Sequence, residues 1–303
     1  MRAFVGVTDR RWYEFLRARP ELSEVNFWRP SGLGFRAISS GEPFLFKTHH
    51  PDNKLVGGGL LSDPVSLRLS EAWDIFGQAN GVASLAELRA AIGRYRRAPL
   101  EVGEDPKIGC ILLREVNFTE IPLDAPPDFA SNVVTGKTYD LATSSGSYVE
   151  SALRHLLFAA ATSGRVPGEV FGRPRLVPQR LGQQAFQALV LAAYERRCAI
   201  TGERIRPVLH AAHIRPVSQD GQNRVDNGLL LRSDVHTLFD RGYLGVGPDR
   251  RIHVSPRLRS EFNNGESLYR RQGEQLTVIP ARTVDRPDRE ALEWHMDVVF
   301  QAS

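Results

Sequence analysis

The sequence has few cysteines and lysines, and it lacks a long apolar run. Its 303 residues include two cysteines, Cys110 and Cys198, which are too few for a disulfide framework or a four-cysteine zinc site. No stretch approaches the ~18 apolar residues typical of a transmembrane helix. The first residues lead directly into charged ones, which is unlike a signal peptide. We therefore expect a protein of the reducing cytoplasm, without a membrane partner.

Lysine is the rarer cation: 4 of the 39 basic residues are lysine and 35 are arginine. Hydrophobic residues make up 42% and charged residues 24% of the chain, as in an ordinary globular protein, so disorder and collagen-like repeats are excluded. Residues 1–150 carry a net charge of −2 (17 basic, 19 acidic), and residues 151–303 carry +6 (22 basic, 16 acidic). A basic, arginine-rich second half is compatible with a polyanionic partner, because the guanidinium group matches phosphate geometry. It is equally compatible with a codon preference for arginine.

Turn residues and hydrophobic periodicity divide the chain into three parts and predict an α+β protein. Residues 1–121 contain short apolar runs at 44–46, 55–61 and 108–113 that are typical of strands. Two helices are predicted between them, one over 69–78 and one opened by the capping box at Ser84. Residues 122–181 are rich in Pro, Ser and Gly and are interpreted as a linker with a helix opened by Ser147. Residues 182–303 form the third part, which begins with a periodic helix around 186–194.

The segment from 197 to 254 carries the candidate chemistry. His213 ends an apolar run that resembles a strand, and Asn227 with Gly228 turns the chain into another. Ser233 can then cap a helix on which His236 and Asp240 are one turn apart and share a face. An imidazole and a carboxylate on one face can bind a divalent metal. His213, on the neighbouring strand, is the candidate general base beside that metal.

These residues resemble the HNH endonuclease family, the ββα-metal nucleases, over roughly residues 180–300. The resemblance implies that His213 activates water, that Asn227 orients the loop of the catalytic histidine, and that His236 binds the metal. It places Asp240 where family members have a further ligand or a group that supports one. The implied metal is Mg²⁺ or Mn²⁺, with Ni²⁺ or Co²⁺ as possible substitutes.

Two departures from the family pattern concern metals. Many relatives have an acidic residue or a histidine as a metal ligand directly before the catalytic histidine, where this chain has Ala212. Either His210 or a water would then fill that position. Relatives with a structural zinc carry two Cys-x-x-Cys pairs, whereas Cys198 is isolated in this region, so we expect no structural zinc.

The first 121 residues resemble, more weakly, the PUA-like superfamily of SRA, EVE, YTH and ASCH domains. The resemblance is carried by Asn26-Phe27-Trp28, by Gly41-Glu42 before a strand, and by the glycine run 57–59. It implies a curved sheet or barrel with a pocket for a flipped base. Trp28 and Trp73 would supply stacking faces and Asn26 an edge contact, although tryptophans are more often part of the core. The glycine run would allow close approach of a nucleotide or mark a bulge.

Together the two resemblances predict a modification-dependent DNA endonuclease. The first domain would read a modified base in double-stranded DNA, with modified cytosine the favoured class, and the HNH domain would hydrolyse a phosphodiester bond, as in antiphage restriction. Breaking both strands favours a homodimer. One alternative is a catalytically degenerate nucleic-acid-binding protein. Another is an HNH nuclease whose N-terminal half binds RNA or protein.

Overall fold

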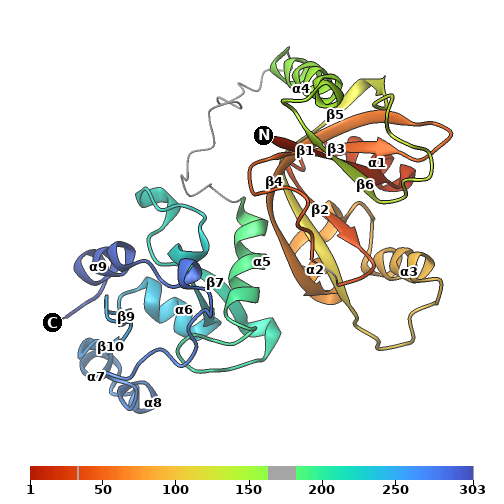
Figure 1. Cartoon of the computed structure of the whole chain (residues 1–303). Coiled ribbons are helices and arrows are strands. Elements are labelled where there is room, and N and C mark those ends of the chain that lie inside the picture. Colours follow the sequence, from red (N-terminus) through yellow and green to blue (C-terminus); the bar gives the residue numbers. More distant parts are fainter. Residues whose placement is uncertain (33, 163–181, 303) are drawn as a thin grey trace. The chain divides into compact units, whose positions relative to one another are not determined.

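The chain folds into two compact units, residues 1–179 and 180–303, which are described separately. The structure is a computed structural model that describes residues 1–32, 34–162 and 182–302 (Figure 1). The expected linker ran from 122 to 181, and its last part, 163–181, lies outside the described residues. Among the described helices, none is long and apolar enough to cross a membrane.

The first unit is built on a six-stranded mixed sheet with the strand order β2-β5-β4-β3-β1-β6 (Figure 1). β1 pairs with β3 in parallel and every other neighbouring pair is antiparallel. The strands are β1 (Arg2–Thr8), β2 (Glu24–Arg29), β3 (Pro43–Thr48), β4 (Lys54–Arg68), β5 (Lys107–Asp124) and β6 (Gly136–Asp140). The helices are α1 (Arg10–Arg17), α2 (Leu69–Phe76), α3 (Leu85–Arg96) and α4 (Ser144–Thr162). The predicted mixture of helices and strands around one sheet is confirmed.

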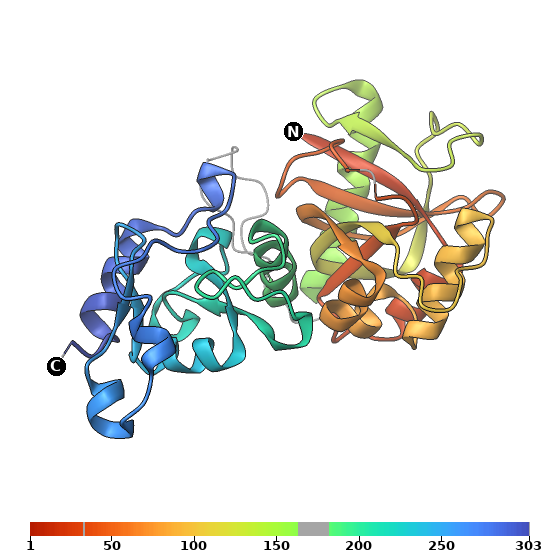
Figure 2. The ribbon, with the colours of Figure 1, turned by 90° about the horizontal axis from the view of Figure 1, so that it is seen from below.

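The sheet extends further along the chain than the sequence indicated. The boundary expected at residue 121 falls inside β5, and β6 adds an edge strand next to β1, with Arg2 opposite Asp140. α4 then packs against the sheet through Val149, Leu153 and Leu156 (Figures 1 and 2). The turn-rich composition of 122–147 concealed a five-residue strand, because Gly136-Lys-Thr-Tyr-Asp140 has little apolar character.

The side chains of β3 alternate between two apolar clusters, which fixes the two faces of the sheet. Phe44 and Phe46 belong to a cluster that includes Trp12 of α1. Leu45 belongs to the opposite cluster, which includes Leu153 of α4. Each face therefore has its own core, and the cluster around Phe44 borders the cavity described below.

Glycines 57–59 lie in a bulged part of β4, where register shifts occur between Leu55 and Gly57 and between Gly58 and Leu60. A Cβ on Gly57 would lie 2.4 Å from the carbonyl oxygen of Asn117, and one on Gly58 would lie 2.9 Å from that of Phe44. Of the two interpretations of this run, the structure therefore supports the bulge. Bulges bend a strand and increase its twist, which curves the sheet.

The sequence predicted helix starts at Ser84 and Ser147, and the structure confirms the first and contradicts the second. The capping box at Ser84 is confirmed, because the Ser84 side chain accepts a hydrogen bond from the amide of Glu87 at 3.2 Å. The prediction that Ser147 caps the next helix is wrong, because α4 already begins at Ser144. Ser147 lies within its first turn and donates its hydroxyl to the carbonyl oxygen of Ser144 at 2.8 Å.

The second unit consists of short strands and helices around the segment 198–247. It contains α5 (Gln183–Ala193), β7 (Leu209–His213), β8 (Gly228–Arg232), α6 (Ser233–Asp240), β9 (Leu244–Val246), β10 (Ile252–Val254), α7 (Arg257–Phe262), α8 (Glu266–Tyr269) and α9 (Arg289–Val298). β7 and β8 form an antiparallel pair and α6 follows β8 without a break. This is the predicted order of strand, loop, strand and helix, except that Ser233 is the first residue of α6 and Arg232 its N-cap.

Candidate active site

His213 is held at the end of β7 by contacts to its face and to its edge. Phe186 of α5 stacks on the imidazole, with ring centroids 4.2 Å apart and planes 10° from parallel. The Nε2 atom lies 2.8 Å from the amide oxygen of Asn223, in the loop between β7 and β8. The side chain is half-buried. The ring plane is thus fixed by packing while part of the ring remains accessible.

Asn227 is buried and ties together the two ends of the loop that follows His213. Its Nδ2 donates to the carbonyl oxygens of Arg215 and Gln222, both at 2.9 Å. Its Oδ1 accepts the amide of Arg215 at 3.0 Å. The backbone amide of Ile214 also donates to the Asn227 carbonyl oxygen. One side chain therefore closes the loop 215–222 next to the candidate general base.

His236 and Asp240 lie one helical turn apart on α6, and the His236 Nε2 atom is 3.3 Å from the Asp240 Oδ2 atom. Burial lowers the pKa of His236; the Asp240 carboxylate opposes this shift, and His210 and His213 reinforce it. Burial also raises the pKa of Asp240, against the effects of His236 and His213. A lowered histidine pKa favours the neutral imidazole, which is the form that binds a metal.

His210 lies on the face of β7 that points the same way as Ala212, because residues two apart in a strand share a face. Its ring centroid is 6.2 Å from that of His236. Ala212 is fully buried and has no side-chain donor to offer. His210 therefore lies on the same strand face as position 212, where many members of the HNH family have a metal ligand.

These residues form a sparse donor set for a metal. Within the described residues, no group of three or more His, Cys, Asp or Glu is arranged closely enough to hold an ion. His236 and Asp240 offer one imidazole and one carboxylate at close range. Such a set fits a cation that takes its other ligands from water and substrate phosphate, as Mg²⁺ commonly does.

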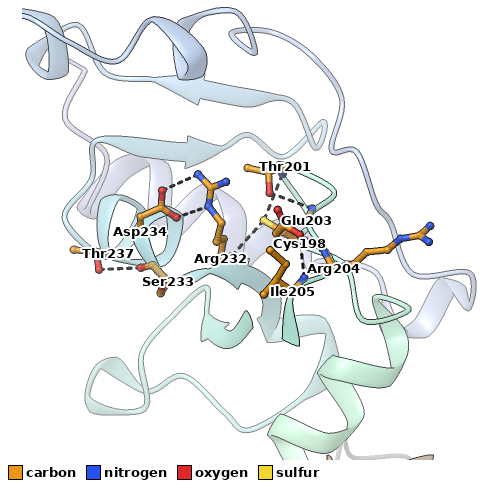
Figure 3. A network of polar contacts seen from close by, with 9 residues as sticks. All are labelled: Cys198, Thr201, Glu203, Arg204, Ile205, Arg232, Ser233, Asp234 and Thr237. Atoms are coloured by element: carbon orange, nitrogen blue, oxygen red, sulfur yellow. Dashed lines mark hydrogen bonds and ion pairs between the residues drawn. The ribbon is translucent and has the colours of Figure 1, made fainter. Parts of the chain in front are cut away.

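Cys198 is buried and belongs to a network of polar contacts in the second unit (Figure 3). Its sulfur accepts the backbone amides of Thr201 at 3.4 Å and Arg232 at 3.3 Å. The Arg232 guanidinium makes two hydrogen bonds to the carboxylate of Asp234, at 2.6 and 2.7 Å. Glu203 accepts the amides of Arg204 and Ile205 (Figure 3). The hydrogen bond from the Arg232 amide to the Cys198 sulfur thus joins the turn at 198–203 to the start of α6.

A separate cavity of about 530 Å³ lies in the first unit. Its aromatic lining comprises Phe4, Trp12, Phe27, Trp28, Phe35 and Tyr95, and its polar lining includes Thr8, Asp9, Arg29, Arg36 and His49. Trp28 is partly buried, donates its indole N–H to the Asn80 carbonyl oxygen at 2.9 Å, and meets Tyr95 edge to face. This volume falls in the range of small-molecule sites.

Two of the three predicted base-binding residues lie away from this cavity. Asn26 is fully buried, and its Nδ2 donates to Asn80 Oδ1 at 2.9 Å and to the Cys110 sulfur at 3.3 Å. Trp73 lies on α2 and does not line the cavity. Asn26 and Trp28 share one face of β2, but the segment around Asn80 covers Asn26. The alternation of side chains along β2 could not predict this long-range contact.

Asp9 lines the same cavity, and the sequence did not identify it as a candidate site residue. Its Oδ2 accepts the Tyr95 hydroxyl at 2.7 Å, and its Oδ1 accepts the amides of Arg11 at 2.7 Å and Trp12 at 3.4 Å. Burial would raise the pKa of Asp9, but these hydrogen bonds outweigh it and the pKa is lowered. The cavity wall thus carries an ionised carboxylate. Asp9 before an amphipathic segment could have been recognised as a helix N-cap, but its contact with Tyr95 joins residues 86 positions apart.

A protein-family model matches part of the second unit. Residues 198–247 match the family model described as HNH endonuclease. The second unit contains an HNH endonuclease domain. The matched residues include β7, the loop closed by Asn227, β8 and α6, so the resemblance identified from the His–Asn–His spacing is confirmed.

Solved structures similar to the chain include an ASCH protein and a restriction endonuclease. The ASCH protein from Zymomonas mobilis is 15% identical, with a TM-score of 0.35, and the alignment covers 49% of this chain and 94% of that one. A mutant form of the same Zymomonas mobilis protein is 10% identical, with a TM-score of 0.36 and coverage of 50% and 95%. The modification-dependent restriction endonuclease TagI is 13% identical, with a TM-score of 0.28 and coverage of 92% and 76%. None of the curated proteins compared with the chain matches it.

Proposed function

We propose that the protein is a modification-dependent DNA endonuclease in which the first unit reads a modified base and the HNH domain cuts the strand. The observation that carries the nuclease half is the convergence of His213, His236 and Asp240 beside a loop closed by Asn227. β7, which ends at His213, contacts α6, which carries His236 and Asp240, and this contact supports a common location for the three side chains. The HNH match over the same residues supports the assignment.

The proposed reaction is hydrolysis of a phosphodiester bond. His213 takes a proton from the attacking water, and its stacking on Phe186 holds the ring in one plane while it does so. Asn227 keeps the loop behind His213 closed. His236 and Asp240 would hold a divalent cation, and His210 is the third candidate ligand. When bound, that cation would stabilise negative charge on the scissile phosphate and the leaving oxygen.

The aromatic cavity of the first unit supports the base-reading half of the proposal. A flipped base needs flat apolar faces and a few polar groups for its edge. Trp28 and Tyr95 offer the faces, and Asp9 is a carboxylate that accepts hydrogen bonds. A carboxylate favours a base with an exocyclic amino group over one that presents a carbonyl there. Cytosine carries such an amino group, as does adenine, so the carboxylate fits a modified cytosine without selecting it over adenine. Arg29 and Arg36 at the cavity suit the flanking phosphates.

A nicking and cleavage assay on plasmid DNA tests this function. Unmodified plasmid and plasmids carrying methylated or hydroxymethylated cytosine are incubated with the protein and with Mg²⁺ or Mn²⁺. Cleavage restricted to modified DNA is the expected result. Equal cleavage of both substrates would indicate a nuclease whose first unit binds RNA or protein. Binding without cleavage would indicate a degenerate site.

The same proposal includes a homodimer on DNA, because one HNH site cuts one strand and a double-strand break needs two cuts. Two copies related by a two-fold axis would direct their sites to opposite strands. Analytical ultracentrifugation of the protein with a short modified duplex measures this directly. A 1:1 complex that still makes double-strand breaks would contradict the dimer.

A further inference from the structure

Asn223 makes the one hydrogen bond that the imidazole of His213 forms within the described part of the chain. The Asn223 Oδ1 atom lies 2.8 Å from His213 Nε2. An amide oxygen can only accept a hydrogen bond, so Nε2 must carry the proton in this contact. In a neutral imidazole the other nitrogen, Nδ1, then holds the free lone pair. That nitrogen alone can take a proton from water.

The backbone on both sides of Asn223 is held in place. The carbonyl oxygen of Gln222 accepts a hydrogen bond from Asn227 Nδ2 at 2.9 Å. The carbonyl oxygen of Arg224 accepts one from the Asn227 amide at 3.0 Å. Asn223 lies between these two fixed carbonyls, so its side chain extends from a backbone that Asn227 restrains.

The loop that leads to Asn223 is also closed tightly. The Gly221 amide donates to the Pro216 carbonyl oxygen at 2.9 Å. A Cβ at position 221 would lie 1.8 Å from the carbonyl oxygen of Arg215, so only glycine fits there. The conformation that brings Asn223 back to His213 is therefore built into the loop.

We infer that Asn223 is a positioning residue that fixes the Nε2–H tautomer of His213 and leaves Nδ1 as the proton acceptor. Phe186 fixes the plane of the ring, Asn223 fixes which nitrogen carries the proton, and Asn227 holds Asn223 in place. The consequence for catalysis rests on the proposed role of His213 as general base. The tautomer itself does not depend on that role.

Nitrogen NMR of the full chain labelled with ¹⁵N-histidine tests the tautomer without any activity measurement. The two neutral tautomers give opposite shift patterns for Nδ1 and Nε2, and the His213 signals are assigned by their loss in His213→Gln. We expect the Nε2–H pattern in the wild-type protein. Asn223→Leu, which has a similar shape but no acceptor, should shift the signals toward a mixture of tautomers. Asn223→Asp retains an acceptor and should keep the Nε2–H pattern.

Gln219→Leu is the matched control, because this amide side chain lies in the same loop but is exposed. It should change neither the spectrum nor cleavage. Asn223→Leu should slow cleavage about 10- to 100-fold, as expected for loss of a group that orients a catalytic residue, with DNA affinity unchanged. An Nδ1–H pattern in the wild type, or unchanged His213 signals in a folded Asn223→Leu, would overturn the inference. An Nε2–H pattern in a protein that cuts no DNA would instead contradict the proposed function.

Discussion

His295 of α9 stacks on the ring of Phe239 in α6 and also hydrogen bonds to its backbone. The ring centroids are 3.8 Å apart, and Nε2 lies 3.1 Å from the Phe239 carbonyl oxygen. The carbonyl requires a proton on Nε2, so Nδ1 is the unprotonated nitrogen, and it is buried without a hydrogen-bond partner among the residues that the structure describes. Protonation of His295 would therefore place a charge in the core without an acceptor.

This burial predicts that the protein loses stability in mild acid. Burial lowers the pKa of His295 to about 4, against the opposing effect of the Phe239 carbonyl, whereas the unfolded chain titrates near 6.5. Between these two values the unfolded state binds the additional proton, so stability falls as the pH decreases from about 6.5 toward 4. The full contribution is about 3 kcal/mol. Urea unfolding from pH 7.5 to 4.5 should show a shallower decline in His295→Gln. An identical decline in that variant would contradict the assignment.

His213→Ala should abolish cleavage because it removes the group that accepts the proton from water. The loss should be about 100- to 10,000-fold, and the half-buried position predicts that folding and DNA binding persist. Cleavage rate, DNA affinity and melting temperature are measured together. Wild-type cleavage in this variant would rule out His213 as the base.

Asn227→Ala should impair both stability and cleavage. The change removes three hydrogen bonds within the loop and leaves two carbonyl oxygens with fewer donors, which costs about 2–4 kcal/mol. Cleavage should fall less than in His213→Ala, because the role is orientation. Denaturant unfolding and single-turnover cleavage measure the two effects. A variant as stable as the wild type would show that the loop does not depend on this side chain.

His236→Ala should raise the Mg²⁺ or Mn²⁺ concentration needed for half-maximal cleavage, because it removes the half-buried imidazole of the proposed site. His210→Ala should raise it less, because His210 is exposed. Metal titrations of both variants on one modified substrate make the comparison. An unchanged titration in His236→Ala argues against its ligand role, and an unchanged one in His210→Ala assigns the position beside Ala212 to water.

Trp28→Ala should remove the preference for modified DNA, because it deletes a stacking face worth ~1–3 kcal/mol per base. Trp73→Ala is the control of equal size, because Trp73 does not line the cavity. The ratio of affinities for modified and unmodified duplexes is measured beside the melting temperature. A retained ratio with a large fall in melting temperature would place Trp28 in the core only.

The sequence was most informative where the determinants of structure are local. The spacing of His213, Asn227 and His236 predicted the order of strand, loop, strand and helix because each element depends on a turn or a helical period within a few residues. Asn26 was different: its polarity on β2 suggested a ligand contact, but its Nδ2 atom donates to Asn80, 54 residues away, inside the core. The stacking of Phe186 on His213 likewise depends on the packing of α5 against β7, which periodicity alone does not specify.

The HNH family match ends at residue 247, yet the groups that complete the fold lie beyond both of its ends. Before it, Phe186 and Val190 of α5 pack so closely on β8 that a Cβ at Gly228 would lie 2.7 Å from Val190. After it, the Asp288 amide donates to the Asp226 carbonyl oxygen, and His295 holds α6. Residues 198–247 transplanted alone onto another DNA-binding protein would lack both supports. We therefore expect a segment that folds when transplanted to run from α5 through α9.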